Sequence, residues 1–203
     1  GWYEKKADIN YQIYVAGDGS VNVFSIKQQL LRDTVYIGSK IPPELTNGQI
    51  GAIKKYGEQI GKYLYDIGYR GVVGVDSIIT TDDIIIPIIE INGRFTLSTY
   101  ISFLDRIMNG NRIATRYFRI STKSFLSYQG LLEMLEERGI DYDTEKKEGV
   151  IIYTCGTFSG GFPDINGFYS GRLFALVSAR EEKNIRYYVN RLENLIGGDL
   201  SEY

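Results

Sequence analysis

Apolar and polar residues alternate from Ile9 to Val15, and the turn sequence GDG follows at residues 17–19. Side chains of a β-strand point alternately to opposite faces of a sheet, so this pattern is typical of a strand with one buried face. A short turn after such a run predicts a hairpin, with the return strand over residues 21–30. This end of the chain is therefore constrained to form an antiparallel pair of strands.

A helix is predicted beyond this hairpin. Within residues 34–45, Gly38 and the pair Pro42-Pro43 first indicate a loop. Apolar residues and one glycine then recur at spacings of three and four between Ile50 and Ile67, which is the period of an amphipathic helix. Gly68 follows at the position of a C-terminal cap.

Two β-rich runs follow the helix. They cover residues 71–79 and 84–94, and the polar turn TTDD separates them, so a second hairpin is expected. Ser98 is expected to cap a short helix that continues to about Met108, where Asn-Gly-Asn at residues 109–111 ends it. A domain boundary is therefore expected near residue 110.

The rest of the chain predicts a helix, two strands and a helix, over residues 128–138, 150–157, 172–178 and 180–196. Ser178 and Glu181 have the spacing of a capping box at the start of the last helix. A glycine-rich link with many aromatic residues joins the two strands. Because it lacks the Lys and hydroxyl ending of a phosphate-binding loop, it predicts a surface loop or an interface.

Histidine is absent from the 203 residues, and Cys155 is the single cysteine. Ser-His-Asp and Cys-His nucleophile systems are therefore excluded, and so are zinc sites built from His or Cys. If a metal is used, oxygen ligands point to a hard cation such as Mg²⁺. Cys155 is expected to pack as a small apolar residue, and a lone thiol suits a reducing compartment, the cytoplasm.

Charge and hydropathy bear on the partners. The 23 basic and 25 acidic residues give a net charge of -2 without a basic cluster, which argues against a nucleic-acid partner. The longest apolar run, residues 84–89, is far shorter than the roughly 20 residues that span a bilayer, so no membrane partner is expected. The first residues, GWYEKKADIN, lack an initiator Met and a signal peptide, and we interpret the chain as part of something longer.

Glu90, Asn92 and Arg94 project from one face of their predicted strand, because residues two apart share a face. Asp76, on the preceding strand, adds a second carboxylate. Two carboxylates and an amide form an incomplete oxygen shell that Mg²⁺ completes with nucleotide phosphates, and Arg94 offers a planar fork to a phosphoryl or carboxylate oxygen. From spacing alone, the alternative is an amphipathic strand with a solvated polar face.

This site requires a particular register. An even turn that paired Ile79 with Ile84 would put Asp76 opposite Pro87, on the wrong face for Glu90. An odd loop or a bulge near Pro87 is therefore predicted.

The order GYRGVVGVDSIITTDDIIIPIIEINGRFTLSTY, an acidic residue followed by a Glu-x-Asn pair and an Arg, resembles the closing hairpin of ATP-grasp enzymes. The first hairpin and the long helix look like the second ATP-grasp subdomain. The resemblance implies an α+β fold, with the C-terminal subdomain of an ATP-grasp fold, an antiparallel sheet with helices, over residues 1–110. Residues 111–203 are expected to form a small α/β C-terminal domain; this tail, with SYQGLLEMLEERGI, loosely resembles that of pheganomycin-type peptide ligases.

The resemblance implies an ADP-forming carboxylate–amine ligase that makes a peptide or amide bond through an acylphosphate, with ATP and Mg²⁺. Asp76, Glu90 and Asn92 would hold the metal, and Arg94 would clamp the transferred phosphoryl group or the acylphosphate. Lys27 is a further candidate for contact with phosphate or nucleotide, against the alternative of a solvated strand-end residue.

The family's first nucleotide-binding subdomain, with its glycine-rich loop, is expected to precede Gly1 in an N-terminal half of the same polypeptide. This chain alone is therefore expected to show little or no turnover. Two alternatives stay open. One is a non-catalytic interaction module that docks a protein through the aromatic link at residues 158–174, and the other is an ATP-grasp carboxylase or kinase with a different acceptor.

Overall fold

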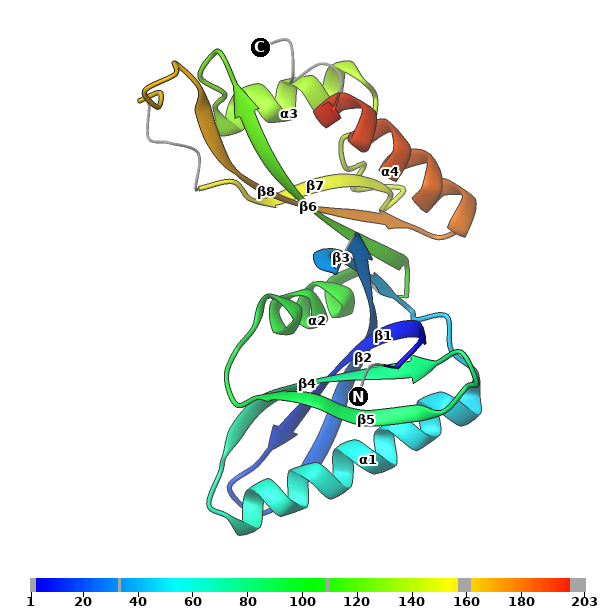
Figure 1. Cartoon of the computed structure of the whole chain (residues 1–203). Helices are drawn as coiled ribbons and strands as arrows, with labels where there is room; N and C mark the ends of the chain where they lie inside the picture. The colour runs from blue at the N-terminus through cyan, green and yellow to red at the C-terminus, as the bar shows by residue number, and fades with distance from the viewer. Residues whose placement is uncertain (1–2, 33, 109, 157–161, 198–203) are drawn as a thin grey trace. The chain divides into compact units, whose positions relative to one another are not determined.

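The computed structural model of the chain describes residues 3–32, 34–108, 110–156 and 162–197. The chain divides into two compact units, whose elements are labelled in Figure 1. The first unit consists of Gly1–Leu30 and Ser39–Asn109, and the second of Leu31–Gly38 and Gly110–Tyr203. The second unit thus includes a short segment from the first half of the chain, which the sequence did not predict.

Four antiparallel strands form the sheet of the first unit, in the order β5-β4-β1-β2. Their bounds are Lys5–Val15 for β1, Val21–Arg32 for β2, Gly71–Thr80 for β4 and Ile85–Asn92 for β5. Both predicted hairpins are confirmed. The two strands at the centre, β1 and β4, are far apart in the sequence.

Helix α1, Asn47–Asp66, covers one face of this sheet and confirms the predicted amphipathic helix (Figure 1). Thr46 caps it in a capping box with Gln49. At Gly57 an added Cβ would lie 2.5 Å from a methyl carbon of Val23, so glycine lets the helix approach β2 closely. The buried core beneath the helix contains Ile9, Tyr11, Ile13, Val15, Ile53, Ile60, Leu64, Val73, Val75 and Ile79.

Helix α2, Leu97–Met108, lies against the opposite face, because it contacts the side chains of β1 that alternate with the core residues. The prediction that Ser98 caps this helix is wrong. Ser98 lies inside α2, and its hydroxyl donates to Asn10 Oδ1 at 2.7 Å. The first turn is closed instead from Thr96, whose carbonyl accepts a hydrogen bond from Thr99 N at 3.0 Å.

The second unit contains β6 (Arg112–Thr122), β7 (Gly149–Thr154) and β8 (Tyr169–Ala179), ordered β6-β8-β7 and antiparallel. Helices α3, Tyr128–Glu137, and α4, Glu182–Gly197, pack on one face. Both helices and the two strands β7 and β8 were predicted, whereas β6 was not. The core beneath the helices includes Ile120, Leu131, Leu135, Ile140, Leu173, Val177, Val189 and Leu192.

Two further predictions about local structure are wrong. Strand β3, Val35–Ile41, runs where a loop was predicted, and Gly38 marks a close approach of two backbones instead of a turn. Gly38 has a φ of 156°, and a Cβ there would lie 1.9 Å from the carbonyl oxygen of Thr115. Ser178 does not cap α4, because it is a buried residue of β8 whose hydroxyl donates to the Lys147 carbonyl at 3.1 Å.

The remaining sequence predictions concern the surface and the link in the second unit. Cys155 packs partly buried against the second core, and burial raises the pKa of its thiol. Phe158, in the predicted aromatic link, and Thr157, the expected strand end, lie outside the described residues.

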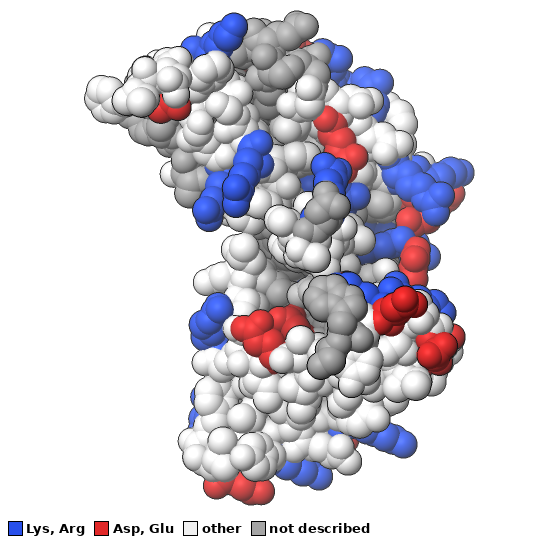
Figure 2. All heavy atoms as spheres, in the orientation of Figure 1, with Lys and Arg blue, Asp and Glu red and all other residues white. Residues whose placement is uncertain are grey.

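Acidic and basic side chains are interspersed on the face shown in Figure 2. None of the helices in the described ranges is both long and apolar enough to cross a bilayer.

Candidate functional site

Asp76 on β4 lies directly opposite Glu90 on β5. The ladder between these strands begins at Ile79 and Ile85, across a turn with an odd number of residues. It then shifts register before it reaches Asp76, so that residues 87–89 of β5 form a bulge. The sequence predicted an odd loop or a bulge near Pro87, and the structure contains both.

Pro87 lies in this bulge, where a residue without an N–H group is tolerated in a sheet. Its carbonyl accepts a hydrogen bond from the hydroxyl of Tyr11 at 2.7 Å. Tyr11 is fully buried in the first core, and burial raises the pKa of its hydroxyl, so this group remains a neutral donor. The core thus holds the bulge in place.

Glu90, Asp76, Asn10 and Lys27 form one row across all four strands of the first sheet. Asp76 is paired with Glu90 on one side and with Asn10 on the other, and Asn10 is paired with Lys27. Directly paired residues share a face, and neighbouring strands lie about 4.8 Å apart. The structure therefore brings three residues singled out in the sequence onto the face that carries α2, with two acids at one end and a lysine at the other.

Asp76 is oriented by two amides. Its Oδ1 accepts hydrogen bonds from Asn10 Nδ2 at 2.8 Å and from Gln29 Nε2 at 2.9 Å. Partial burial raises the pKa of this carboxyl; the amide of Asn10 opposes the rise, and the negative charge of Glu90 adds to it. Among the described residues none donates a hydrogen bond to Oδ2, so this oxygen is available to a ligand.

A chain of hydrogen bonds connects these amides to α2. Asn10 Oδ1 accepts from Ser98 Oγ and from Gln12 Nε2, each at 2.7 Å, and Gln12 Oε1 accepts from Thr99 Oγ1 at 2.7 Å. Asn10 and Gln12 are buried, so each amide is fixed in one orientation. The alternating pattern of the sequence places Asn10 and Gln12 on the polar face of their strand, but it does not connect them to Asp76. Two amide side chains on the same face of one strand were the only sign in the sequence of this hydrogen-bond chain.

Asn92 and Arg94 lie at the end of the same hairpin. Asn92 is two residues from Glu90 and therefore on its side of β5, and it is paired with Gly74. Arg94 is exposed, and its Nη2 donates to Asn92 Oδ1 at 3.1 Å. The exposed carboxylate of Glu90 makes no hydrogen bond or ion pair with the part of the chain that the structure describes.

Lys27 differs from its expected environment. It is fully buried in the middle of β2, and its Nζ donates to Ser102 Oγ of α2 at 2.6 Å, so the alternative of a solvated strand-end residue is wrong. Burial lowers the pKa of Lys27 to about 7, although the negative charge of Asp105 opposes this effect. Burial also raises the pKa of Asp105, and Lys27 opposes that rise.

The side-chain oxygen atoms of Asp76, Glu90 and Asn92 are suitable ligands for a hard cation. No three Asp, Glu, His or Cys residues gather into a metal cluster within the described ranges, so two carboxylates and the Asn92 amide are an incomplete shell. Mg²⁺ usually binds through one or two carboxylates and completes its octahedron with phosphates and water. The free Oδ2 of Asp76 and the free carboxylate of Glu90 suit such a cation, because both are acceptors without a donor.

Known proteins resemble this chain over part or nearly all of its length. Residues 9–98 match the family model described as the ATP-grasp domain. A curated relative, the [butirosin acyl-carrier protein]–L-glutamate ligase of Niallia circulans, is 25% identical over 188 residues. This alignment covers 91% of the chain and 42% of the ligase.

Two solved structures share the fold. The phosphoribosylaminoimidazole carboxylase ATPase subunit from Aquifex aeolicus matches with a TM-score of 0.58 and 13% identity, over 96% of this chain and 57% of that one. N5-carboxyaminoimidazole ribonucleotide synthetase from Thermus thermophilus matches with a TM-score of 0.60 and 12% identity, over 97% of this chain and 52% of that one. The chain spans about half the length of the proteins that it matches.

The matched residues 9–98 contain the whole row from Glu90 to Lys27, together with Asn92 and Arg94. The solved structures extend the likeness in fold to nearly the whole chain, as a mixed α+β protein with antiparallel strands. The family match confirms the resemblance of residues 9–98 to the ATP-grasp domain, and the solved structures show that the fold is shared.

Proposed function

We propose that this chain is the C-terminal catalytic half of an ATP-dependent carboxylate–amine ligase, which forms a peptide or amide bond through an acylphosphate and releases ADP. The observation that carries the proposal is the direct pairing of Asp76 with Glu90. Like charges that lie directly opposite each other destabilise a sheet, and here a bulge is needed to create the pair. A solvated strand or a docking module has no need of this arrangement, whereas a cation site does.

Asp76, Glu90 and Asn92 are the proposed holders of Mg²⁺. When bound, this ion supplies positive charge that offsets the charge of the ATP phosphates. Asp76 and Glu90 contribute carboxylate oxygens, and Asn92 contributes a neutral amide oxygen. The hydrogen bonds from Asn10 and Gln29 to Oδ1 of Asp76 keep its Oδ2 free for the ion.

Arg94 is the proposed clamp on the transferred phosphoryl group or the acylphosphate. Its hydrogen bond to Asn92 places the guanidinium beside the proposed metal ligands. A planar guanidinium binds two oxygens of one phosphoryl group at once, and its charge is already in place when negative charge develops there.

Lys27, at the opposite end of the row from Glu90, is the proposed further contact to phosphate or nucleotide. Two strand spacings, about 10 Å, separate it from Asp76. Its Nζ is covered by α2 and bonded to Ser102, so direct contact with a nucleotide requires α2 to move.

The relative in Niallia circulans suggests the first substrates to test, because its name describes the ligation of L-glutamate to an acyl-carrier protein. We propose an acid and an amine of this kind as the substrate pair. We also propose that the rest of the nucleotide site lies in a preceding half of the polypeptide, which fits the 42% of that ligase that this chain spans.

The metal site is testable on the chain itself by thermal unfolding in MgCl₂. At ten times the dissociation constant, binding to the folded state alone adds about 1.4 kcal/mol, which corresponds to a rise of roughly 3 to 6 °C in Tm. Glu90→Ala is expected to abolish this rise. Glu58→Ala removes an exposed acid from α1 and is expected to leave it unchanged.

Potassium chloride at matched ionic strength is the second control and is expected to give no rise. A magnesium effect of equal size in Glu90→Ala would overturn the metal assignment. For the ligase itself, ADP release by the longer protein should depend on both L-glutamate and an acyl-carrier protein. ADP release that depends on neither would overturn this substrate pair.

A further inference from the structure

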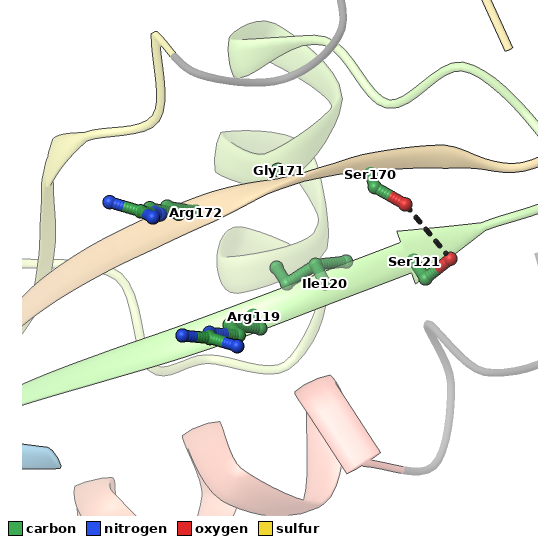
Figure 3. Close-up of a pocket in the computed structure, with 6 residues that line it drawn as sticks. All are labelled: Arg119, Ile120, Ser121, Ser170, Gly171 and Arg172. Carbon is green, nitrogen blue, oxygen red and sulfur yellow. Dashed lines mark hydrogen bonds between the residues drawn. The ribbon is translucent and has the colours of Figure 1, made fainter. Parts of the chain in front are cut away.

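Arg119 on β6 and Arg172 on β8 lie directly opposite each other in the second unit. Both side chains extend in the same direction from the ladder (Figure 3). They line an open pocket of about 440 Å³, together with Ser121 and Ser170, whose hydroxyl oxygens lie 3.2 Å apart. The pocket thus combines two guanidinium groups with two hydroxyl groups.

This pocket lies on the face of the sheet opposite to α3 and α4. Ile120 and Leu173, the chain neighbours of the two arginines, are buried in the core beneath those helices. Successive residues of a strand point to opposite faces, so Arg119 and Arg172 point away from the core, and both are exposed. The arginines therefore have no role in packing this core.

Arg119 is held in a defined orientation. Its Nε donates to the hydroxyl of Tyr117 at 3.2 Å, and the ring of Tyr117 packs on Phe174 with centroids 4.9 Å apart. This hydrogen bond leaves the two terminal nitrogens of Arg119 as donors, and no acid in the described ranges pairs with them. A side chain positioned in this way is ready to bind an acceptor with two oxygens.

Two like charges directly opposite each other destabilise an antiparallel ladder, and an anion between them turns this repulsion into attraction. We infer that the pocket binds a phosphate group, as inorganic phosphate or as a phosphate monoester. A phosphate monoester carries about -1.5 to -2 charges at pH 7, which matches two guanidinium groups. Its three oxygens also suffice for both arginines and the serine hydroxyls, whereas a carboxylate has one charge and two oxygens, which a single guanidinium satisfies.

This inference does not depend on the proposed ligase function, because the six residues that line the pocket lie in the second unit and none belongs to the site around Asp76. Its test needs no ATP, Mg²⁺ or turnover. Failure of either proposal therefore leaves the other standing.

Isothermal titration of the whole chain with inorganic phosphate, at constant ionic strength, tests the site. We expect saturable binding that Arg119→Gln and Arg172→Gln each weaken at least tenfold. Arg119→Lys keeps the charge but loses the fork, and it is expected to weaken binding less than Arg119→Gln does. Arg186→Gln removes an exposed guanidinium from α4 and is expected to bind phosphate like the wild type.

Equal phosphate affinity in the wild type and in a folded Arg119→Gln protein would overturn the site. If the arginine variants do not fold, the double variant Ser121→Ala with Ser170→Ala provides the test. It should weaken phosphate binding severalfold, and an unchanged affinity for phosphate would overturn the site. Succinate that binds as tightly as phosphate would overturn the choice of phosphate. Phenyl phosphate is expected to compete with inorganic phosphate, which assigns the site to monoesters, and its failure to compete would restrict the site to free phosphate.

Discussion

The hydroxyl of Tyr11 donates a 2.7 Å hydrogen bond to the carbonyl of Pro87, within the bulge that brings Asp76 opposite Glu90. Tyr11 lies on the face of the sheet that α1 covers, whereas the carboxylate pair lies on the opposite face. The geometry of the proposed metal site is therefore tied to the core of the first unit.

Removal of this hydroxyl should destabilise the protein. Tyr11→Phe leaves the partly buried carbonyl of Pro87 without its donor, and we expect a loss of about 1 to 3 kcal/mol in the free energy of unfolding. Urea denaturation measures this loss. Tyr14→Phe, at an exposed position of the same strand, should change the stability by less than about 0.5 kcal/mol, and equal losses in both variants would argue against a role for the hydrogen bond.

The buried amine of Lys27 should make stability depend on pH. Its pKa of about 7 in the folded chain lies below its ordinary value of 10.5, because burial disfavours the charged form. Between these two values the unfolded chain binds more protons than the folded chain. The free energy of unfolding therefore rises with pH in this window, by up to about 1.4 kcal/mol per pH unit from this residue.

Lys27→Met is expected to remove this contribution, so that the pH dependence of stability between pH 7 and pH 9 becomes flatter than in the wild type. Urea denaturation at pH 7, 8 and 9 gives both slopes. Lys62→Met, at an exposed position of α1, serves as the matched control and should keep the wild-type slope. A slope in Lys27→Met equal to that of the wild type would contradict the lowered pKa.

Two glycine substitutions should have opposite effects on stability. Gly38→Ala places a Cβ against the Thr115 carbonyl at a positive φ, so the backbone must shift, and we expect a loss of at least about 2 kcal/mol. Gly51→Ala lies within α1 with no atom within 4 Å of the added Cβ, and it should gain about 0.5 to 1 kcal/mol. Thermal unfolding of both variants provides the comparison, and a neutral Gly38→Ala would contradict the close backbone contact.

Substitutions in the longer protein should separate binding from chemistry. Glu90→Gln and Asn92→Ala are expected to lower turnover much more than nucleotide affinity, because contacts to the metal strengthen as charge shifts in the transition state. Arg94→Lys should lower turnover on the order of a hundredfold, since Lys keeps the charge but loses the fork. Rates of ADP formation and a nucleotide titration distinguish the two effects, and wild-type turnover in Arg94→Lys would remove Arg94 from the mechanism.

The local pattern of the sequence was sufficient for several parts of the fold and the site. A period of two predicted the first hairpin, and two β-rich runs around a polar turn predicted the second. A period of three to four predicted α1. The same period of two placed Glu90 and Asn92 on one face. Because a one-residue slip reverses every side chain of a strand, the sequence also required an odd loop or a bulge near Pro87 if Asp76 was to join them.

Local pattern failed where a residue's environment comes from distant parts of the chain. In the sequence, Gly38 resembles a turn residue. The structure shows that it lies within β3, where the backbone of β6 is too close to leave room for a Cβ atom. Lys27 resembles a solvated residue, and only the packing of α2 over β2 buries it and lowers its pKa. Neither neighbour is close in the sequence.

The row from Glu90 through Asp76 and Asn10 to Lys27 is also a product of tertiary structure. Its members come from four strands, and their order depends on β4 pairing with β1 instead of continuing beyond β2. That pairing joins residues 56 to 75 positions apart, so it is decided by the burial of both strands beneath α1 and not by any local preference. The sequence alone determined which side chains share a strand face, whereas the order of the strands determined which of them meet.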